Sequence, residues 1–151
     1  MRLTTKSRYG TRLLLDLAIY SKKKPVRLSD VSKRQGISLK YLEKLIRNLK
    51  QAGYVKSIRG PYGGYMLAKP TKEISVGDIV RIMEDSQTIT DCTEKENVCG
   101  VCTQAGECLS QWIWMETAKA MFEKLDSFKI DKLLTSSTKI LKKKSISTKN
   151  A

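Results

Sequence analysis

The stretch RLSDVSKRQGISLKYLEKLIRNLKQAGYVKSIRGPYGGYMLAKP, residues 27–70, decides the fold. Its first half predicts two helices, of residues 30–35 and 39–52, with Gly36 between them. Glycine accepts the left-handed conformation that ends helices. A short helix, a tight glycine turn and a longer helix are typical of a helix-turn-helix, although an ordinary helical hairpin would show the same pattern. The predicted cap residues are Ser29 and Ser38.

The second of these helices has two faces with different chemistry. One apolar stripe at helical spacing is expected to be buried: Leu42, Leu45, Ile46 and Leu49. Off that stripe the side chains are mostly basic or polar, as contact with base edges and phosphates requires. The candidate DNA contacts of this helix and its cap are Ser38, Lys40, Tyr41, Glu43 and Lys44.

Glu43 is unusual on this face, because a carboxylate near phosphates is repelled. Near a base edge it can accept a hydrogen bond from cytosine N4. Alternatively, it pairs with Arg47 one helical turn later. The sequence leaves both interpretations open.

A β-hairpin is predicted directly after the second helix. Residues 54–58 and 65–68 form two short strands, and the turn between them, RGPYGG, is rich in glycine and proline. A hairpin in this position is the wing of a winged helix. Arg59 lies at its tip, where it can enter a minor groove, although a solvated turn residue fits the pattern too.

Positive charge is concentrated in the same part of the chain. The formal net charge is +14, and residues 1–88 hold 19 Lys and Arg against 7 Asp and Glu. Such an excess suits a polyanion such as DNA, or is merely a solvated basic surface. The sequence shows no membrane span and no signal peptide, so a cytoplasmic protein is expected. It has no P-loop, no GxGxxG motif and no histidine, so no enzyme is predicted.

Further helices are expected on both sides of this segment, at residues 7–20, 74–85 and 110–126. The last one carries more apolar surface than a terminal helix needs, in a stripe of Trp114, Ala118, Met121, Leu125 and Phe128, with Trp112, Met115 and Phe122 beside it. It packs on its own domain or, as we favour, forms a two-fold dimer interface, because helix-turn-helix modules commonly bind paired half-sites.

The predicted fold class is therefore mostly α with a small β-hairpin: a winged helix-turn-helix domain plus a long dimerisation helix. The expected organisation has four parts. They are a DNA-binding domain over 1–86, a cysteine-rich loop over 87–109, a dimerisation region over 110–134 and a basic, disordered tail over 135–151.

All four cysteines lie in DCTEKENVCGVCTQAGEC, residues 91–108, with the spacing C-x6-C-x2-C-x5-C. A reducing cytosol argues against structural disulfides. Iron–sulfur clusters are held by thiolates, and structural zinc often uses two CxxC pairs, of which this loop has one. A reversible disulfide between Cys99 and Cys102 is a third alternative. The spacing alone does not separate iron–sulfur from zinc.

Several segments resemble the IscR-type winged-helix regulators, whose bacterial family also includes NsrR-type nitric-oxide sensors and CymR-type regulators of cysteine metabolism. These segments are MRLTTKSRYG at 1–10, residues 37–70, ISVGDIV at 74–80 and the cysteine loop. The resemblance implies a homodimer, an iron–sulfur cluster held by three cysteines, and DNA binding that depends on cluster state. It favours a 2Fe–2S over a 4Fe–4S cluster, and implies that Glu43 tunes site choice by penalising wrong sites.

The chain departs from this family pattern at the fourth cluster ligand. IscR-type regulators carry a histidine three residues after the last cysteine, where this chain has Gln111, a poor iron ligand. The nitric-oxide sensors use an aspartate near the N-terminus of the partner subunit, where this chain has Arg8, which cannot ligate. The predicted core ligands are Cys92, Cys99 and Cys108, with Cys102 as the candidate fourth. Cys102 could instead be the middle ligand, because its spacing to Cys108 matches the last spacing of the family, and a carboxylate such as Glu43 is a distant possibility for the fourth bond.

Together these features predict a homodimeric transcription regulator that binds paired half-sites in double-stranded DNA and senses cluster supply or redox state. A regulator of the same fold without a cluster, with zinc or with a thiol switch, is the alternative. A small iron–sulfur electron carrier is the alternative from a different class, but it would have no use for a recognition helix. Salt-dependent binding to duplex DNA separates the two classes.

Overall fold

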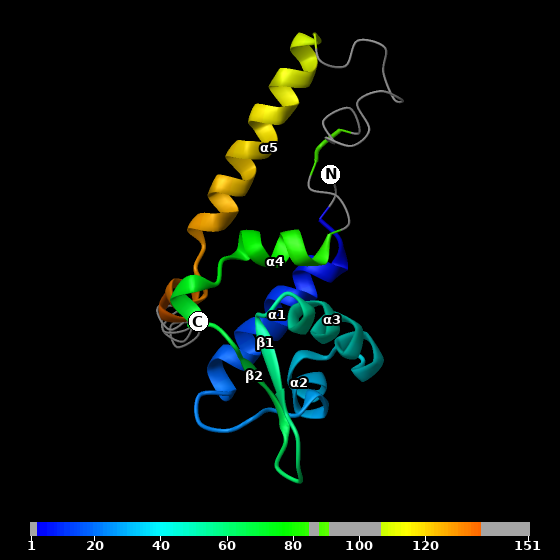
Figure 1. The fold of residues 1–151 in the computed structure, drawn as a ribbon, viewed down its shortest axis with the longest axis vertical. Helices are drawn as coiled ribbons and strands as arrows, with labels where there is room; N and C mark the ends of the chain where they lie inside the picture. Colours follow the sequence, from blue (N-terminus) through cyan, green and yellow to red (C-terminus); the bar gives the residue numbers. More distant parts are fainter. Residues whose placement is uncertain (1–2, 85–87, 91–106, 137–151) are drawn as a thin grey trace, which may run out of the picture.

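The structure is a computed structural model that describes residues 3–84, 88–90 and 107–136. In these residues five α-helices, a β-hairpin and a 3-10 turn follow one another, and residues 130–136 are again helical (Figure 1). The mostly α fold with one small hairpin is as predicted. In chain order the elements are α1 Thr5–Tyr20, α2 Leu28–Gln35, α3 Leu39–Gln51, β1 Val55–Ile58, β2 Gly64–Leu67, η1 Thr71–Glu73, α4 Val76–Met83 and α5 Leu109–Ser127.

The helix-turn-helix consists of α2 and α3. Gly36 ends α2 in the left-handed conformation, with φ of 62°, as its place in the sequence predicts. The Ser38 side chain caps α3 by accepting from the backbone N–H of Tyr41. The predicted cap at Ser29 is wrong, because α2 begins at Leu28, two residues before the predicted start at Asp30, and Arg27 occupies the cap position without a side-chain hydrogen bond.

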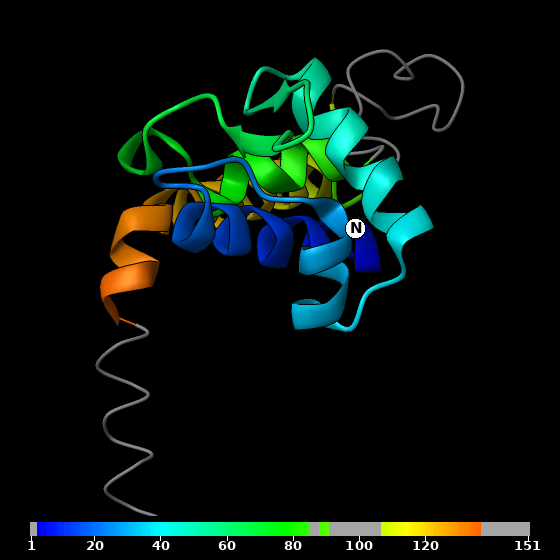
Figure 2. The same ribbon diagram turned by 90° about the horizontal axis from the view of Figure 1, so that it is seen from below.

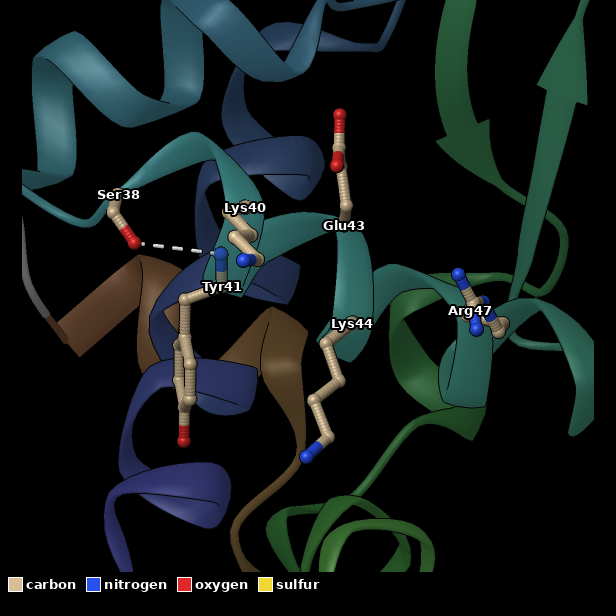
Figure 3. A pocket seen from close by; sticks show the side chains of 6 residues that line it. All are labelled: Ser38, Lys40, Tyr41, Glu43, Lys44 and Arg47. Carbon is tan, nitrogen blue, oxygen red and sulfur yellow. Dashed lines mark hydrogen bonds between the residues drawn. The ribbon is translucent and has the colours of Figure 1, made fainter.

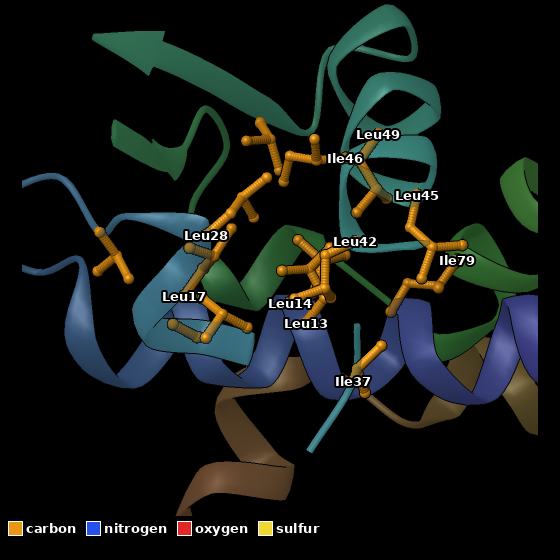
Figure 4. Packing of buried hydrophobic residues seen from close by; sticks show 14 of the residues in the cluster. Leu13, Leu14, Leu17, Leu28, Ile37, Leu42, Leu45, Ile46, Leu49 and Ile79 are labelled. Carbon is orange, nitrogen blue, oxygen red and sulfur yellow. The ribbon is translucent and has the colours of Figure 1, made fainter. Parts of the chain in front are cut away.

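The core lies where α1, α3 and α4 meet (Figure 4). The four apolar residues predicted for the buried stripe of α3 are all buried. They pack with leucines of α1 and with Ile79 and Met83 of α4. Gly10 lets α1 and α4 approach closely, since a Cβ there would lie 2.9 Å from the Met83 side chain. The shared core fixes the recognition helix against the rest of the domain.

The wing is the antiparallel pair β1 and β2, in register from Val55 opposite Leu67 to Ile58 opposite Gly64. Val26, just before α2, bridges to Tyr65 of β2 through two backbone hydrogen bonds of 3.0 and 2.8 Å. The approach is close, because a Cβ on Gly64 would collide with the Val26 carbonyl. The wing is thereby attached to the helix-turn-helix rather than projecting freely.

Among the described residues, the C-terminal half of α5 contacts the domain. Asp126 accepts a bidentate ion pair from Arg81 of α4, at 2.7 and 2.8 Å. The following segment returns to the domain and buries Ile130 completely. Figure 2 shows the helical residues 130–136 at the end of α1 opposite its first turn. The first part of α5 extends away from the domain (Figure 1), and no residue of this helix is buried.

Within the described ranges, no helix is both long and apolar enough to cross a membrane.

Candidate nucleic-acid interface

The outer face of α3 is an exposed, mainly basic surface. Its side chains border a hollow that runs along the helix (Figure 3). Two lysines and an arginine contribute positive charge there, and one glutamate lies among them. The lining residues are Ser38, Lys40, Tyr41, Glu43, Lys44 and Arg47. The structure thus brings together on one face all five residues of the cap and recognition helix that the sequence proposes as DNA contacts.

A second hollow connects this face to the wing. It is lined by residues of α3, among them Arg47 and Lys50, and by Tyr65 of β2. The recognition helix and the wing therefore border one surface. A rod-shaped polyanion lying along α3 would also meet the wing.

Replacing Lys44 with alanine should weaken binding to duplex DNA, because the exposed ammonium group no longer neutralises a phosphate or donates to guanine. The slope of log affinity against log salt should fall by about one per subunit if the contact is to phosphate. Fluorescence anisotropy titrations at several salt concentrations measure both quantities. Lys119→Ala, an exposed lysine on α5, is the matched control, and an equal loss in both variants would contradict a specific role for Lys44.

Tyr41 differs from its neighbours on α3, because its side chain points toward α1 (Figure 3). Its hydroxyl lies 3.2 Å from Oγ1 of Thr5, and its ring meets that of Tyr9 edge to face, with centroids 5.8 Å apart. The residue is half-buried. These contacts hold the first turn of α3 against α1.

The Glu43 side chain is exposed. Its carboxylate and the Arg47 guanidinium lie apart in Figure 3, and none of the ion pairs in the described part of the chain joins them. The intrahelical pair considered from the sequence does not form. An unpaired carboxylate on a basic face restricts what that face can bind.

The wing tip is held by a contact that the sequence does not reveal. Arg27 donates from Nη2 to the carbonyl of Pro61, at 2.6 Å. The turn is closed by a hydrogen bond from the Gly63 N–H to the Gly60 carbonyl, at 2.9 Å. Gly60 has φ of 119°, which favours glycine. Arg59 is exposed at the start of this fixed loop.

Behind the interface, a buried carboxylate joins α1 to α2. Asp16 is fully inaccessible and accepts from Arg34 at 3.0 and 2.6 Å and from Gln35 Nε2 at 2.9 Å. The hydrogen bond to Asp16 raises the pKa of Arg34. The sequence shows Asp16 only as a polar residue of the first helix. Its contact with α2 orients the helix that precedes the recognition helix.

A second carboxylate fixes the start of α1. Glu84, which follows α4, accepts through Oε1 from the Thr4 N–H at 2.9 Å, from the Thr4 hydroxyl at 3.0 Å and from the Ser7 hydroxyl at 2.6 Å. Burial favours the neutral acid, but the hydrogen bonds from Ser7 and Thr4 outweigh burial and lower the pKa of Glu84. This contact stabilises the turn of α1 that Tyr41 touches.

Glu84→Gln should make the protein less sensitive to acid. A carboxylate with a lowered folded-state pKa stabilises the fold above its unfolded-state pKa, and this stabilisation is lost as the pH falls through the folded-state value. The variant should be less stable than wild type at neutral pH by about 1 kcal/mol, and the difference should shrink with acidification. Urea unfolding between about pH 6 and about pH 3 measures it. Glu73→Gln, at an exposed carboxylate, is the control, and a pH-independent difference would contradict the prediction.

Of the four predicted cluster ligands, only Cys108 belongs to the described residues. It is the N-terminal cap residue of α5 and is half-buried. Cys92, Cys99 and Cys102 lie outside the described residues. Among the residues that the structure describes, which include Cys108, no group of three or more His, Cys, Asp or Glu side chains is placed to hold a metal ion. The cluster site therefore stays a prediction from the sequence.

Known proteins resemble this chain over nearly all of the described residues. The family model Rrf2, an iron-dependent transcriptional regulator, matches residues 3–136. The protein rrf2 of Nitratidesulfovibrio vulgaris (strain Hildenborough) is 49% identical over 134 residues, which are 89% of this chain and 87% of that protein. The HTH-type transcriptional regulator IscR of Pectobacterium carotovorum (strain PC1) is 40% identical over 89% of this chain and 79% of its own length. The structure of CymR, the global cysteine regulator of B. subtilis, has a TM-score of 0.74 at 31% identity and covers 90% of this chain and 98% of that one.

Proposed function

The chain belongs to the Rrf2 family of transcriptional regulators, and we propose that it is a homodimeric DNA-binding regulator controlled by an iron–sulfur cluster. The observation that carries the DNA-binding part is the continuous surface formed by the basic face of α3 and the wing. The family and its relatives are described as transcriptional regulators, which are not enzymes.

In this proposal, α3 lies in the major groove. Ser38, Lys40 and Lys44 contact phosphates or base edges, and a lysine can donate to guanine O6 and N7. Arg59, exposed on a fixed wing, enters the flanking minor groove. Glu43 accepts from cytosine N4 at the preferred site and repels sites that place a phosphate or an acceptor beside it. Tyr41, the remaining predicted contact of this helix, borders the same hollow and also holds α3 in place through its contacts with α1.

The two-fold partner is proposed to pack on α5. Large apolar side chains of this helix are exposed in the single chain, including Leu109 at 74% and Trp112 at 60%. Exposed apolar surface of this extent on an extended helix is typical of an interface. Because each helix carries one DNA-binding domain at its C-terminal end, the pairing of two such helices would set the spacing of the half-sites.

The cluster is proposed to be bound by Cys92, Cys99 and Cys108, with Cys102 supplying the fourth bond. Thiolates are the usual ligands of iron–sulfur clusters, and the 2Fe–2S form is favoured over 4Fe–4S by the resemblance to IscR-type regulators. The family description names iron dependence. Cys108 begins the same helix that carries the proposed interface. Binding of a cluster by these cysteines would therefore act on the first turn of α5 and bias the proposed dimer between two states.

Iron and acid-labile sulfide per chain, measured with the visible spectrum on protein purified without air, test the cluster. Stoichiometric sulfide is expected, and each cysteine-to-alanine variant that loses the colour names a ligand. Cys102→Ala decides whether this thiol supplies the fourth bond. Colourless protein, with zinc or with no metal, would overturn the cluster while leaving a DNA-binding regulator.

A cluster-free regulator is the second candidate. It is favoured by Gln111, which stands where IscR-type proteins have a histidine. Duplex DNA binding that is unchanged by iron removal but altered by oxidation of the thiols would support this candidate.

A further inference from the structure

Tyr62, in the wing loop, is 89% exposed. This is the largest exposed fraction among the exposed large apolar side chains of the described residues; the next is Leu109 at 74%. In that part of the chain Tyr62 forms no hydrogen bond and no ring contact. An aromatic ring held in water in this way contributes nothing to the fold and has its whole surface available to a partner.

The loop that carries Tyr62 is fixed before any partner binds. The preceding residue, Pro61, has a rigid backbone, and its carbonyl accepts from Arg27. The hydrogen bond between Gly63 and Gly60 closes the turn around Tyr62. A Cβ on Gly63 would collide with backbone atoms of the same loop, so the turn is tightly packed at this position. Little conformational freedom of the backbone remains to be lost on binding, which favours affinity.

The surroundings of Tyr62 select a polyanionic partner. Residues 54–70, which contain the whole hairpin, hold Lys56, Arg59 and Lys69 and no Asp or Glu. The same hairpin borders, through Tyr65, the hollow beside the basic face of α3. Figure 1 shows the loop as the part of the hairpin farthest from the body of the domain. A duplex that lies along α3 would present its flanking minor groove to this tip.

We propose that Tyr62 is a further DNA-contact residue, whose ring enters the minor groove beside Arg59 and packs against sugars and base edges. This inference rests on the proposed DNA-binding function and adds to it a source of specificity. An arginine alone favours the narrow minor groove of stiff A-tracts, whereas a ring beside it needs a groove that can widen. Flexible pyrimidine–purine steps such as TA widen and unstack at low cost, and side-chain wedges in other minor-groove proteins use them in this way. The pair should therefore select TA-containing flanks over A-tract flanks.

The test uses full-length protein and a duplex selected by the wild type from a randomised pool, made in two versions, with TA-containing or A-tract flanks. Anisotropy titrations over several salt concentrations compare Tyr62→Ala, Tyr62→Phe and Arg59→Ala with wild type. Tyr62→Phe keeps the ring and removes only the hydroxyl. Thermal unfolding of each variant checks the fold, which an 89% exposed side chain should not affect.

Tyr62→Ala should lose at least about fivefold in affinity for the TA-flanked duplex, the lower end of what an aromatic–base contact contributes. Its salt dependence should equal that of wild type, because no charge is removed. Tyr62→Phe should bind nearly as wild type, and Arg59→Ala should lose about one unit of salt slope per subunit. The preference for TA over A-tract flanks should disappear in Tyr62→Ala.

Two results would overturn the role of Tyr62 while leaving the proposed DNA-binding function intact. One is wild-type affinity and flank preference in Tyr62→Ala. The other is unchanged DNA binding combined with loss of regulated transcription in a purified system, which would assign Tyr62 to a protein partner. Failure of the wild type to bind any duplex from the pool in a salt-dependent way would overturn the proposed DNA-binding function itself.

Discussion

Replacing Trp112 and Met115 together with glutamine should convert the proposed dimer into a monomer and weaken binding to a duplex with two half-sites by at least about 100-fold. The two residues lie one turn apart on α5, and they are 60% and 50% exposed in the single chain. Tryptophan is among the residues that contribute most to interfaces, and truncating such a residue typically costs about 2 kcal/mol or more. In a two-fold interface each substitution occurs twice, so the loss is multiplied.

The effect on DNA follows from the loss of bivalency. A monomer binds one half-site, and it loses the gain of roughly 10² to 10⁴ that linking two binding modules provides. Glutamine leaves the net charge unchanged, so the general attraction to DNA is preserved. Binding to a duplex with a single half-site should therefore be nearly the same as in wild type.

Sedimentation equilibrium and anisotropy titrations with one-site and two-site duplexes measure these quantities. The matched control is Lys119→Gln with Glu123→Gln, two exposed polar residues of the same helix whose replacement also leaves the net charge unchanged. If the Trp112 and Met115 variant stays dimeric, α5 does not form the interface through this face.

The sequence was sufficient for the elements whose signal is local. The stripe of α3, the glycine that ends α2 and the hairpin turn each depend on residues within a few positions of one another, and they are present in the structure. The start of α2 differs from the prediction because the packing of Leu28, which is buried, begins the helix two residues earlier than a cap at Ser29 implies.

The candidate interface is predictable only in part, because some of its contacts join residues that are far apart in the sequence. That α3 presents a polar face follows from its periodicity. That Tyr41 turns to α1 depends on Thr5, which is 36 residues away, and the clamp formed by Glu84 joins residues 77 and 80 positions apart. Such contacts arise from the packing of whole helices, so no local sequence pattern predicts them. The exposure of Tyr62 does not follow from the sequence either, because a tyrosine in a turn can be buried or exposed.

Arg34→Ala should lower the free energy of unfolding by roughly 3 kcal/mol at neutral pH, the lower end expected for breaking a buried ion pair from one side. The carboxylate of Asp16 has no solvent exposure, so without Arg34 it would keep the hydrogen bond from Gln35 Nε2 but no opposite charge. The lower end applies because the Arg34 side chain is itself 30% exposed, which allows water to reach the space that it leaves. The variant also loses the contact between the guanidinium and the Tyr20 ring, 4.1 Å from its centroid.

Urea unfolding of four proteins separates the charge from the packing: wild type, Arg34→Ala, Asp16→Leu with Arg34→Met, and the control Lys33→Ala at an exposed neighbour on α2. Apolar replacement of a whole buried pair is often neutral, so the double variant should recover most of the loss. A single variant within about 1 kcal/mol of wild type would mean that the pair behaves like a surface ion pair.

Because Asp16 and Arg34 join α1 to the helix before the recognition helix, the double variant also isolates the effect of this ion pair on DNA binding. If it is stable yet binds the two-site duplex more weakly than Lys33→Ala, the ion pair fixes the angle of the helix-turn-helix and not only the stability of the fold.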